Sequence, residues 1–413
     1  MADVFIVGVG ITPLGKHLDK SVKRLTAMAL DAALADAGCA ARDIQAAWFA
    51  NTRQGIFEGQ HGIRGQVALR PAGLEGIPIF NTDNACASST AALHLGYAYV
   101  KAGLCDVALA LGTEKMNYPD KRDLGFQAFK GSMDQELAEE QIKKLIALGE
   151  ALELPPEAVR DTGPHSIFMD TYSAAARYHM KKYGTTQRQL AAVAAKNHQH
   201  STMNPLAHYR TSMTIDEVLA DKLISWPLTR SMCAPITDGS GAVVICSEAA
   251  LVKFDRKRAV RIRAAQITTG VTRGHDDFEH QVSRLAAKRA YEQAGLGPDD
   301  LSVVEVHDAS AFGEIKQIES IGLCAAGDGG PMAERGETSL GGRIPVNPSG
   351  GLLSKGHPIA ATGAIQIHEL VTQLRGEAGK RQVPGARIAA AENGGGFYDG
   401  EEATAAVTIL ERA

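Results

Sequence analysis

The chain has 413 residues, of which 45% are hydrophobic and 22% are charged, and its formal net charge is −4. This balance is typical of a folded α/β protein and excludes a largely disordered chain. The slight negative charge gives no overall electrostatic reason to bind nucleic acid or an anionic membrane.

No apolar run reaches the roughly 18 residues of a membrane-spanning helix. The chain enters a strand at Val4 without a basic region or a cleavage site, so we expect a cytoplasmic protein without a membrane span. The six cysteines are scattered without a CxxC pair, which argues against a zinc knuckle or a disulfide framework. His275, Asp276 and Asp277 have metal-ligand composition but no coherent spacing, so we expect no metal.

Short apolar runs and helical patterns alternate along the first third of the chain. They predict strands and helices in the order strand 4–9, helix 21–37, strand 46–50, strand 77–80, helix 88–101 and strand 106–112. The alternation returns after residue 250, in the order strand 260–267, helix 284–294, strand 303–307, helix 361–374 and strands 387–391 and 403–410. Such alternation builds a sheet with helices on its faces.

The two parts of the chain look like copies of one another. The segment 32–50 parallels 289–307, and the turn and helix start at 86–93 parallel those at 357–365. We therefore predict an N-terminal half over residues 1–250 and a C-terminal half over residues 251–413.

The segment from about residue 117 to residue 234 does not fit the repeat. It holds helical patterns around 133–152, 171–183 and 186–200. Long insertions with helices of their own usually form a lid or a binding region, so we interpret this one as a cover over the site. The alternative is a decoration that adds only stability or a dimer contact.

Cys86 lies where an apolar strand gives way to a helix, among the small residues of the stretch 84–90, NACASST. Unpaired N–H groups and the helix dipole at such a turn favour the thiolate, which is the nucleophilic form of cysteine. The small neighbours leave room for a substrate. Most cysteines are buried apolar fillers, and this is the role that we expect for the other five: Cys39, Cys105, Cys233, Cys246 and Cys324.

His357 lies in an elaborate glycine-rich turn. Gly356 precedes it and Pro358 follows it, and proline is favoured at the first position of a helix. This turn is the repeat partner of the cysteine turn, so an imidazole here could take the thiol proton. A lone histidine is more often a structural residue, which is the alternative.

Four groups of residues together resemble the thiolase superfamily in order and spacing. They are Asn84–Ser89, Asp238–Ala242, Asn347–Gly351 with Lys355–Gly363, and Asn393–Gly396. The resemblance covers essentially the whole chain, insertion included.

This resemblance implies an α/β fold with two pseudo-symmetric βαβαβαββ halves in a five-layered αβαβα arrangement, and a helical loop domain over the active site. It implies a homodimer or a dimer of dimers, with acyl-CoA and CoA as substrates and no other cofactor. Cys86 would take the acyl group as a thioester and His357 would activate it. Backbone N–H groups near Cys86 and near Gly394 or Gly395 would form one oxyanion hole.

The chain departs from common thiolases at residues 307–310. It has His-Asp-Ala-Ser there instead of an Asn-Glu-Ala-Phe motif, which is closer to the sterol-carrier-protein type of thiolase. In that type, His307 would join His357 in a second oxyanion hole and help to hold the thioester enolate.

A second departure is a missing acid/base. Ordinary thiolases place a second cysteine near the C-terminus, where this chain reads Ala391-Glu392-Asn393-Gly394, and the sterol-carrier type can use a position that is Ala309 here. Claisen chemistry needs a base near the α-carbon, and a carboxylate with a raised pKa can supply it. We expect Glu392 to be this substitute; the alternative is an ordinary charged residue at a strand end.

The leading interpretation is an acyltransferase that cleaves a 3-oxoacyl-CoA, or runs the reverse Claisen condensation, through an acyl-Cys86 intermediate. A second interpretation is a retro-aldol carbon–carbon lyase, as in thiolase-like lipid-transfer proteins that need a small zinc-ribbon and OB-fold partner. A third is a noncatalytic acyl-CoA or lipid carrier. The intact Cys86 and His357 turns favour the first over the third.

Overall fold

The computed structural model describes residues 3–150, 152–159 and 162–413. Its centre is a nine-stranded mixed sheet in the order β3-β2-β4-β7-β1-β8-β11-β10-β9. The N-terminal half supplies β1 (Val4–Ile11), β2 (Ala46–Ala50), β3 (Ile79–Thr82), β4 (Val107–Glu114) and β7 (Gly239–Ser247). The C-terminal half supplies β8 (Val260–Thr269), β9 (Val303–Glu305), β10 (Ile388–Gly395) and β11 (Thr404–Arg412).

The two halves of the sheet meet at a narrow seam. Strand β1 pairs with β7 from Val4 to Ile11, but it pairs with β8 only at Phe5 and Ile6. The strands up to β7 therefore form one half of the sheet and the strands from β8 form the other. The domain boundary at residues 250 and 251 falls between them and stays a prediction.

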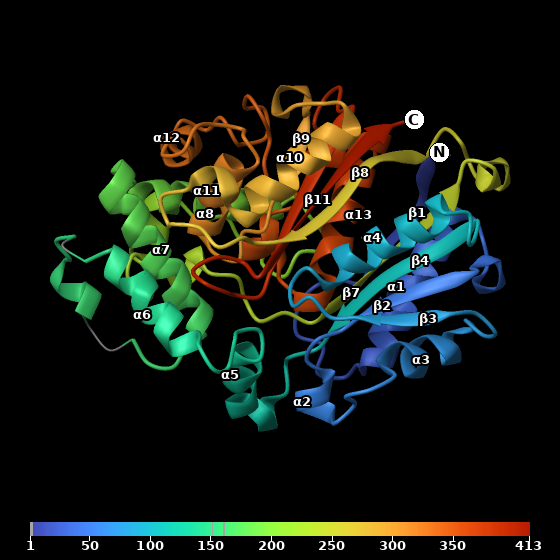
Figure 1. Ribbon diagram of the computed structural model, residues 1–413, viewed down its shortest axis with the longest axis horizontal. Helices are drawn as coiled ribbons and strands as arrows, with labels where there is room; N and C mark the ends of the chain where they lie inside the picture. Colours follow the sequence, from blue (N-terminus) through green and yellow to red (C-terminus); the bar gives the residue numbers. More distant parts are fainter. Residues whose placement is uncertain (1–2, 151, 160–161) are drawn as a thin grey trace.

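Helices cover both sheet halves and fill the space between them (Figure 1). The outer layer of the N-terminal half holds α1 (Val22–Ala37) and α3 (Arg64–Leu69), and that of the C-terminal half holds α10 (Val282–Ala294) and α11 (Ala311–Ser320). Helices α4 (Ser88–Lys101) and α13 (Thr362–Arg375) share one central core with strands of both halves. The layers therefore follow the αβαβα order that we expected.

The alternation of β1 shows how sequence sets these layers. Val4 and Ile6 face the central core, whereas Phe5 and Val7 face the core under α1. This is the period-two pattern of a strand buried on both faces. Val9 returns to the central core because the pairing of β1 with β7 shifts register between Ile6 and Gly8.

The central helices approach each other closely. A Cβ on Gly363 of α13 would lie 1.9 Å from the hydroxyl oxygen of Thr90 on α4. The backbone N–H of Ala364 donates to the hydroxyl of Ser89 at 3.1 Å. Small residues at the start of both helices therefore allow the contact that fixes how the two halves meet.

Several elements match the predictions and a few differ. The strand at 46–50 and the helix at 88–101 have the predicted bounds. Strand β3 begins two residues later than predicted, after Pro78, which has no N–H to donate to a ladder. Strand β9 ends at Glu305, and no strand was predicted for β7, whose nine residues are all buried and show no alternation.

The insertion forms a helical layer beside the sheet, drawn in green tones in Figure 1. It contains α5 (Arg122–Lys130), α6 (Ala138–Leu148), α7 (Ile167–Tyr183), α8 (Gln187–Ser201), α9 (Ile215–Leu219) and a hairpin of β5 (Leu223–Ser225) and β6 (Leu228–Thr229). Two short helices elsewhere are α2 (Gln54–Glu58) and α12 (Gly329–Glu334).

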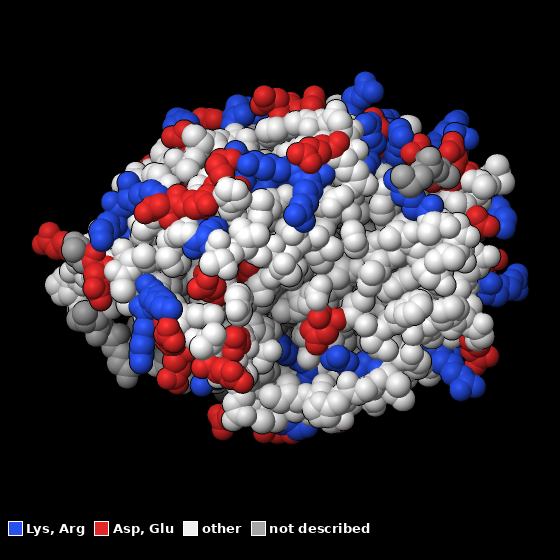
Figure 2. Space-filling model, in the orientation of Figure 1, with Lys and Arg blue, Asp and Glu red and all other residues white. Residues whose placement is uncertain are grey.

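Charged side chains of both signs are interspersed over the face shown in Figure 2. That distribution agrees with the small net charge of the chain. Within the described ranges, no helix combines the length and the apolar character that crossing a bilayer requires.

Candidate active site

Three side chains that are distant in sequence converge at one end of the central layer. One ligand atom each of Cys86, His307 and His357 lies within 4.8 Å of the other two. The two imidazole rings lie at right angles to each other, with centroids 5.2 Å apart. The structure thus brings together the three residues that the motifs singled out.

The turn that carries Cys86 is held by its own polar groups. Ala85 has a left-handed backbone with φ of 48°, and the Ser88 hydroxyl donates to its carbonyl at 2.6 Å. The same hydroxyl oxygen accepts from the N–H of Asn84 at 2.8 Å. Gly395 lies against this turn so closely that a Cβ there would be 2.2 Å from the carbonyl oxygen of Asn84. Because this approach admits no side chain, glycine is required at residue 395.

The ionisation of Cys86 differs from the sequence expectation. Burial raises the pKa of its thiol to about 12, although Arg53 and the backbone N–H groups of Cys86 and Gly396 act in the opposite direction. Cys86 precedes α4 by two residues, because Ala87 is the N-cap. The resting residue is therefore a thiol at neutral pH, and a base must remove its proton before it can attack.

His357 is oriented to be that base. Burial lowers the pKa of its imidazole well below the usual value, so it is neutral at pH 7. The Thr362 hydroxyl donates to the Pro358 carbonyl at 3.3 Å, and its oxygen lies 2.7 Å from Nδ1 of His357. While the hydroxyl donates to Pro358, its oxygen accepts from Nδ1–H, which leaves Nε2 unprotonated and able to take the thiol proton.

His307 has the opposite tautomer. Burial lowers its pKa to about 4, so it is also neutral. Its Nδ1 lies 3.0 Å from the Asn393 side-chain nitrogen, which can only donate, and the Asn393 oxygen accepts from the Thr90 hydroxyl at 2.8 Å. The proton of His307 is therefore on Nε2, where it can donate to an oxyanion.

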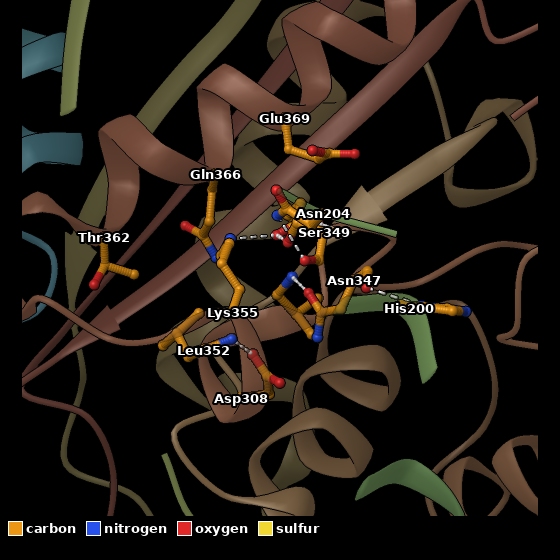
Figure 3. Close-up of polar contacts among 12 residues, drawn as sticks. His200, Asn204, Asp308, Asn347, Ser349, Leu352, Lys355, Thr362, Gln366 and Glu369 are labelled. Atoms are coloured by element: carbon orange, nitrogen blue, oxygen red, sulfur yellow. Dashed lines mark hydrogen bonds and ion pairs between the residues drawn. The ribbon is translucent and has the colours of Figure 1, made fainter. Parts of the chain in front are cut away.

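Asp308 positions the turn in front of His357. Its carboxyl group accepts from the N–H of Leu352 at 2.7 Å (Figure 3). It also accepts from the side chain of Asn197 at 2.8 Å. Leu352 belongs to a π-helical turn, Gly351–Lys355, that leads into His357. A Cβ on Gly351 would lie 2.1 Å from an Asp308 oxygen, so the turn accepts no side chain there.

The Asn-Pro-Ser-Gly-Gly motif is an anchor for the same turn. The carbonyl of Asn347 accepts from a ring nitrogen of His200 at 3.0 Å (Figure 3). The side-chain oxygen of Asn347 accepts from the N–H of Val306 at 2.9 Å. Glu305 accepts from the Ser349 hydroxyl at 2.8 Å and pairs with the buried Lys355 at 3.1 Å. These motif residues support the catalytic turns rather than face the cavity.

A cavity of about 350 Å³ opens in front of Cys86, His307 and His357. The insertion contributes much of its wall, which confirms that this segment covers the site. The aromatic residues of that wall are Phe126, Phe129, Phe168, Tyr172 and Tyr209. Ile236, Ile359 and Met116 add apolar surface. The shape and polarity suit a ligand with a long apolar part.

The described residues that line this cavity do not include Glu392. Its carboxyl group accepts from the N–H of His307 at 3.1 Å and from the hydroxyl of Ser283 on α10 at 3.2 Å. Burial and the neighbouring Glu402 raise its pKa to about 8, so it holds a proton at neutral pH. Glu392 therefore holds the backbone of His307 in place, and its role as a base stays a prediction.

Glu402 is the carboxylate that lines the cavity. Burial opposes its ionisation, but Lys316 at 2.6 Å outweighs burial and lowers the pKa of Glu402 below the usual value. Gln317 donates to its other oxygen at 3.1 Å. No motif marked this residue, because it follows the glycine-rich loop by several positions.

From the sequence, three further residues were not assigned to the site: Arg53, Cys233 and Gly396. Arg53 lines the wall, and so does Cys233, which we had expected to be a structural filler. The Cys233 thiol donates to the carbonyl of Thr229 at 3.3 Å. Gly396 supplies the backbone N–H near the sulfur, whereas Gly394 and Gly395 line the cavity and their oxyanion role stays a prediction.

Among the described residues, the group that could hold a metal ion is the catalytic cluster itself. A thiolate and imidazole nitrogens are ligands that zinc accepts. The expectation of no metal stays a prediction.

Comparison with known proteins places this arrangement in a family. The thiolase N-terminal domain matches residues 4–215, and a thiolase C-terminal domain-like profile matches residues 264–412. The chain is 36% identical to an acetyl-CoA acetyltransferase of Methanothermobacter thermautotrophicus, with 100% of both chains covered. It is 35% identical to sterol carrier protein 2 of Oryctolagus cuniculus, covering 94% of this chain and 69% of that protein.

A solved structure titled Ltp2-ChsH2(DUF35) aldolase has the same fold, with a TM-score of 0.77 at 21% identity, over 99% of this chain and 98% of that one. The matched domains and full-length relatives show that the chain belongs to the thiolase family. The expected five-layered fold is confirmed.

The raised pKa of Cys86 predicts an unusual alkylation profile. Only the thiolate reacts with iodoacetamide, so a thiol with a pKa near 12 should react about tenfold faster per pH unit from pH 7 to pH 10. An ordinary cysteine levels off above roughly pH 9. Peptide mass spectrometry of the Cys86 peptide measures the rate, and a plateau near neutral pH would show a thiolate–imidazolium pair instead.

Proposed function

We propose that this thiolase-family protein is an acyltransferase that moves an acyl group between CoA thioesters through a covalent acyl-Cys86 intermediate. The observation that supports it most is the pairing of two neutral histidines with opposite tautomers beside one thiol. One histidine can accept the thiol proton and the other can donate to an oxyanion. A noncatalytic carrier has no chemical need for that combination.

In the first step, Nε2 of His357 takes the thiol proton while Cys86 Sγ attacks the 3-oxo carbonyl carbon of a 3-oxoacyl-CoA. The carbon–carbon bond breaks, Cys86 keeps the acyl group and the other fragment leaves as a thioester enolate. Nε2–H of His307 donates to the oxygen that carries the developing charge, and such preorganised donors are worth roughly 10²–10³ in rate each.

In the second step, the thiol of CoA attacks acyl-Cys86 while Nε2 of His357 takes its proton. The new acyl-CoA is released, and His357 returns the proton to the Cys86 thiolate that leaves. The enolate must also gain a proton at its α-carbon, and the reverse condensation must remove one. We assign this transfer to Glu402, which lines the cavity and is ionised at neutral pH. In cleavage it accepts the proton that His357 took from Cys86 and delivers it to the α-carbon, and in condensation it removes the α-proton. Glu392 faces away from the cavity, so we assign it a positioning role behind His307.

The retro-aldol lyase is the second candidate. A solved aldolase with a DUF35 component shares the fold, and Tyr172 and Tyr209 line the cavity, where they could move protons. In that case Cys86 would not be acylated and a zinc-ribbon and OB-fold partner would be needed. Acylation of Cys86 therefore separates the two candidates.

We also propose a homodimer. Strand β3 is an edge of the sheet and exposes Phe80, which stacks on Trp48. An uncovered edge strand with an aromatic side chain favours pairing with a second copy. Light scattering should give twice the monomer mass for the purified protein, and Phe80→Glu should shift it toward the monomer; a monomeric wild type would contradict this proposal.

Intact-protein mass spectrometry tests the acyl-enzyme directly. Wild type mixed with a panel of acyl-CoA and 3-oxoacyl-CoA thioesters should gain the mass of the acyl group, and added CoA should remove it. Cys86→Ala should gain nothing, because the nucleophile is absent.

Cys39→Ala is the matched control, since it removes a half-buried thiol that packs against the core under α1 instead of lining the cavity. It should be acylated as wild type is. Absence of an adduct in every mixture would contradict acyl transfer through Cys86 and direct attention to the lyase and its partner.

Proton transfer at the α-carbon gives a separate prediction. Glu402→Gln should reduce 3-oxoacyl-CoA cleavage and exchange of the α-hydrogen into D₂O by roughly 10²–10⁴-fold. Acylation of Cys86 by simple acyl-CoA should fall much less, because that half-reaction moves no α-proton.

Glu392→Gln and Cys233→Ala are the comparison variants for this measurement. If one of these variants loses the exchange while Glu402→Gln retains it, the proton transfer belongs to the residue replaced in that variant, Glu392 or Cys233.

A further inference from the structure

One charged side chain in the cavity wall has no ion partner in the part of the chain that the structure describes. Arg53 immediately precedes α2, lines the cavity and is only 6% exposed. Its guanidinium donates to the hydroxyl of Ser132. The Nε–H has no acceptor, and Arg53 enters no ion pair within the described residues. Most of the hydrogen-bonding capacity of this buried cation is therefore unused.

The other charged groups of the cavity wall are paired. Glu402 pairs with Lys316 at 2.6 Å, and Arg230 pairs with Asp221 at 2.8 Å. His165 lies 2.9 Å from Asp170. Burying an unpaired charge is costly, so the absence of a partner at Arg53 calls for an anion from outside the chain.

Glu114 is close to Arg53 but does not supply that anion. Its carboxyl oxygens accept from the backbone N–H groups of Arg53 at 3.0 Å and Ala360 at 3.2 Å, and from the side chains of Asn51 and Thr52. This acceptor capacity is used by the loops around the site. The guanidinium N–H groups of Arg53 therefore make no hydrogen bond to Glu114 and can bind a ligand.

The position of Arg53 indicates which part of a ligand would meet it. Arg53 lines the same cavity as Cys86, and its positive charge acts on the Cys86 thiol, so the guanidinium lies near the atom that would carry the acyl group. The phosphates of CoA are separated from the thioester by the whole pantetheine arm. An anion at Arg53 would therefore belong to the acyl part.

Arg53 also borders a second hollow of about 840 Å³, lined by His61, Arg64 and Asp83. Figure 2 shows basic and acidic side chains at a hollow in the lower middle of the molecule. The charged end of an acyl group would thus reach a polar region, while its middle stays against the apolar wall.

We propose that the acyl group handled by this protein carries a second carboxylate, and that Arg53 binds this carboxylate through its guanidinium fork. The substrate class is then the CoA thioesters of dicarboxylic acids and their 3-oxo derivatives. The planar guanidinium of an arginine can donate two parallel hydrogen bonds to one carboxylate. The ammonium group of a lysine does not have this geometry. This inference rests on the proposed acyl transfer and narrows its substrate.

A matched series of thioesters tests the proposal. Acylation rates of Cys86 are measured with succinyl-, glutaryl- and adipyl-CoA and with their neutral isosteres 4-methylpentanoyl-, 5-methylhexanoyl- and 6-methylheptanoyl-CoA. Wild type should prefer at least one carboxylated member by roughly 10- to 100-fold. Arg53→Met should lose that preference, and Arg53→Lys should keep only part of it.

Arg230→Met is the matched control, because it removes another arginine of the cavity wall that already has a partner. It should retain the preference for the carboxylated thioester. Thermal unfolding of each variant shows whether it is folded.

Two outcomes overturn the proposal. Wild type without any preference excludes carboxylate recognition. An equal slowing of both members of each pair in Arg53→Met assigns Arg53 to stabilising the thiolate instead.

Binding separates a failure of this inference from a failure of acyl transfer. Calorimetry with Cys86→Ala should show tighter binding of the preferred carboxylated thioester than of its isostere, and Cys86→Ala with Arg53→Met should not. This preference would support the carboxylate site even if no acyl-enzyme formed. Equal binding of each pair would overturn it.

Discussion

The close contact between α4 and α13 is the constraint on which the site depends. Gly363 faces Thr90 without room for a side chain, and Ser89 accepts from the backbone of Ala364. Thr90 then donates to Asn393, which holds His307. The contact that joins the two halves is thus also the contact that orients a site residue. Because each turn precedes one of these helices, bringing the helix starts together brings Cys86 to His357.

Burial controls the chemistry of all three central groups. It keeps both imidazoles neutral and raises the pKa of the Cys86 thiol to about 12. Neutral imidazoles can have distinct tautomers, and the neighbours Thr362 and Asn393 select opposite ones. The resting site therefore holds a protonated thiol, an unprotonated imidazole nitrogen and an imidazole N–H.

The cavity wall combines a large apolar surface with few charges. Aromatic side chains of the insertion form much of it, and its charged groups other than Arg53 have partners among the described residues. In such a low-dielectric region, a single unpaired cation has a stronger influence than it would at the surface. The insertion supplies much of the apolar wall, whereas Arg53 and Glu402 come from segments outside it.

The resemblance of its motifs to thiolases indicated Cys86, His307 and His357. The sequence by itself predicted the repeat and most local elements, because these depend on periodicity and on spacings between neighbours. The bounds of α4 and β2 could be predicted for this reason. It did not determine which way a strand residue faces. On β10, Asn393 faces Thr90 of the central layer, so its neighbour Glu392 faces Ser283 of the outer layer.

Only the tertiary structure placed Glu402, Cys233 and Arg53 in the cavity, since their neighbours there come from distant segments. It also decided the ionisation of Cys86. A turn ahead of a helix favours a thiolate locally, but the burial that reverses this preference comes from segments folded over the turn, and no local pattern records it.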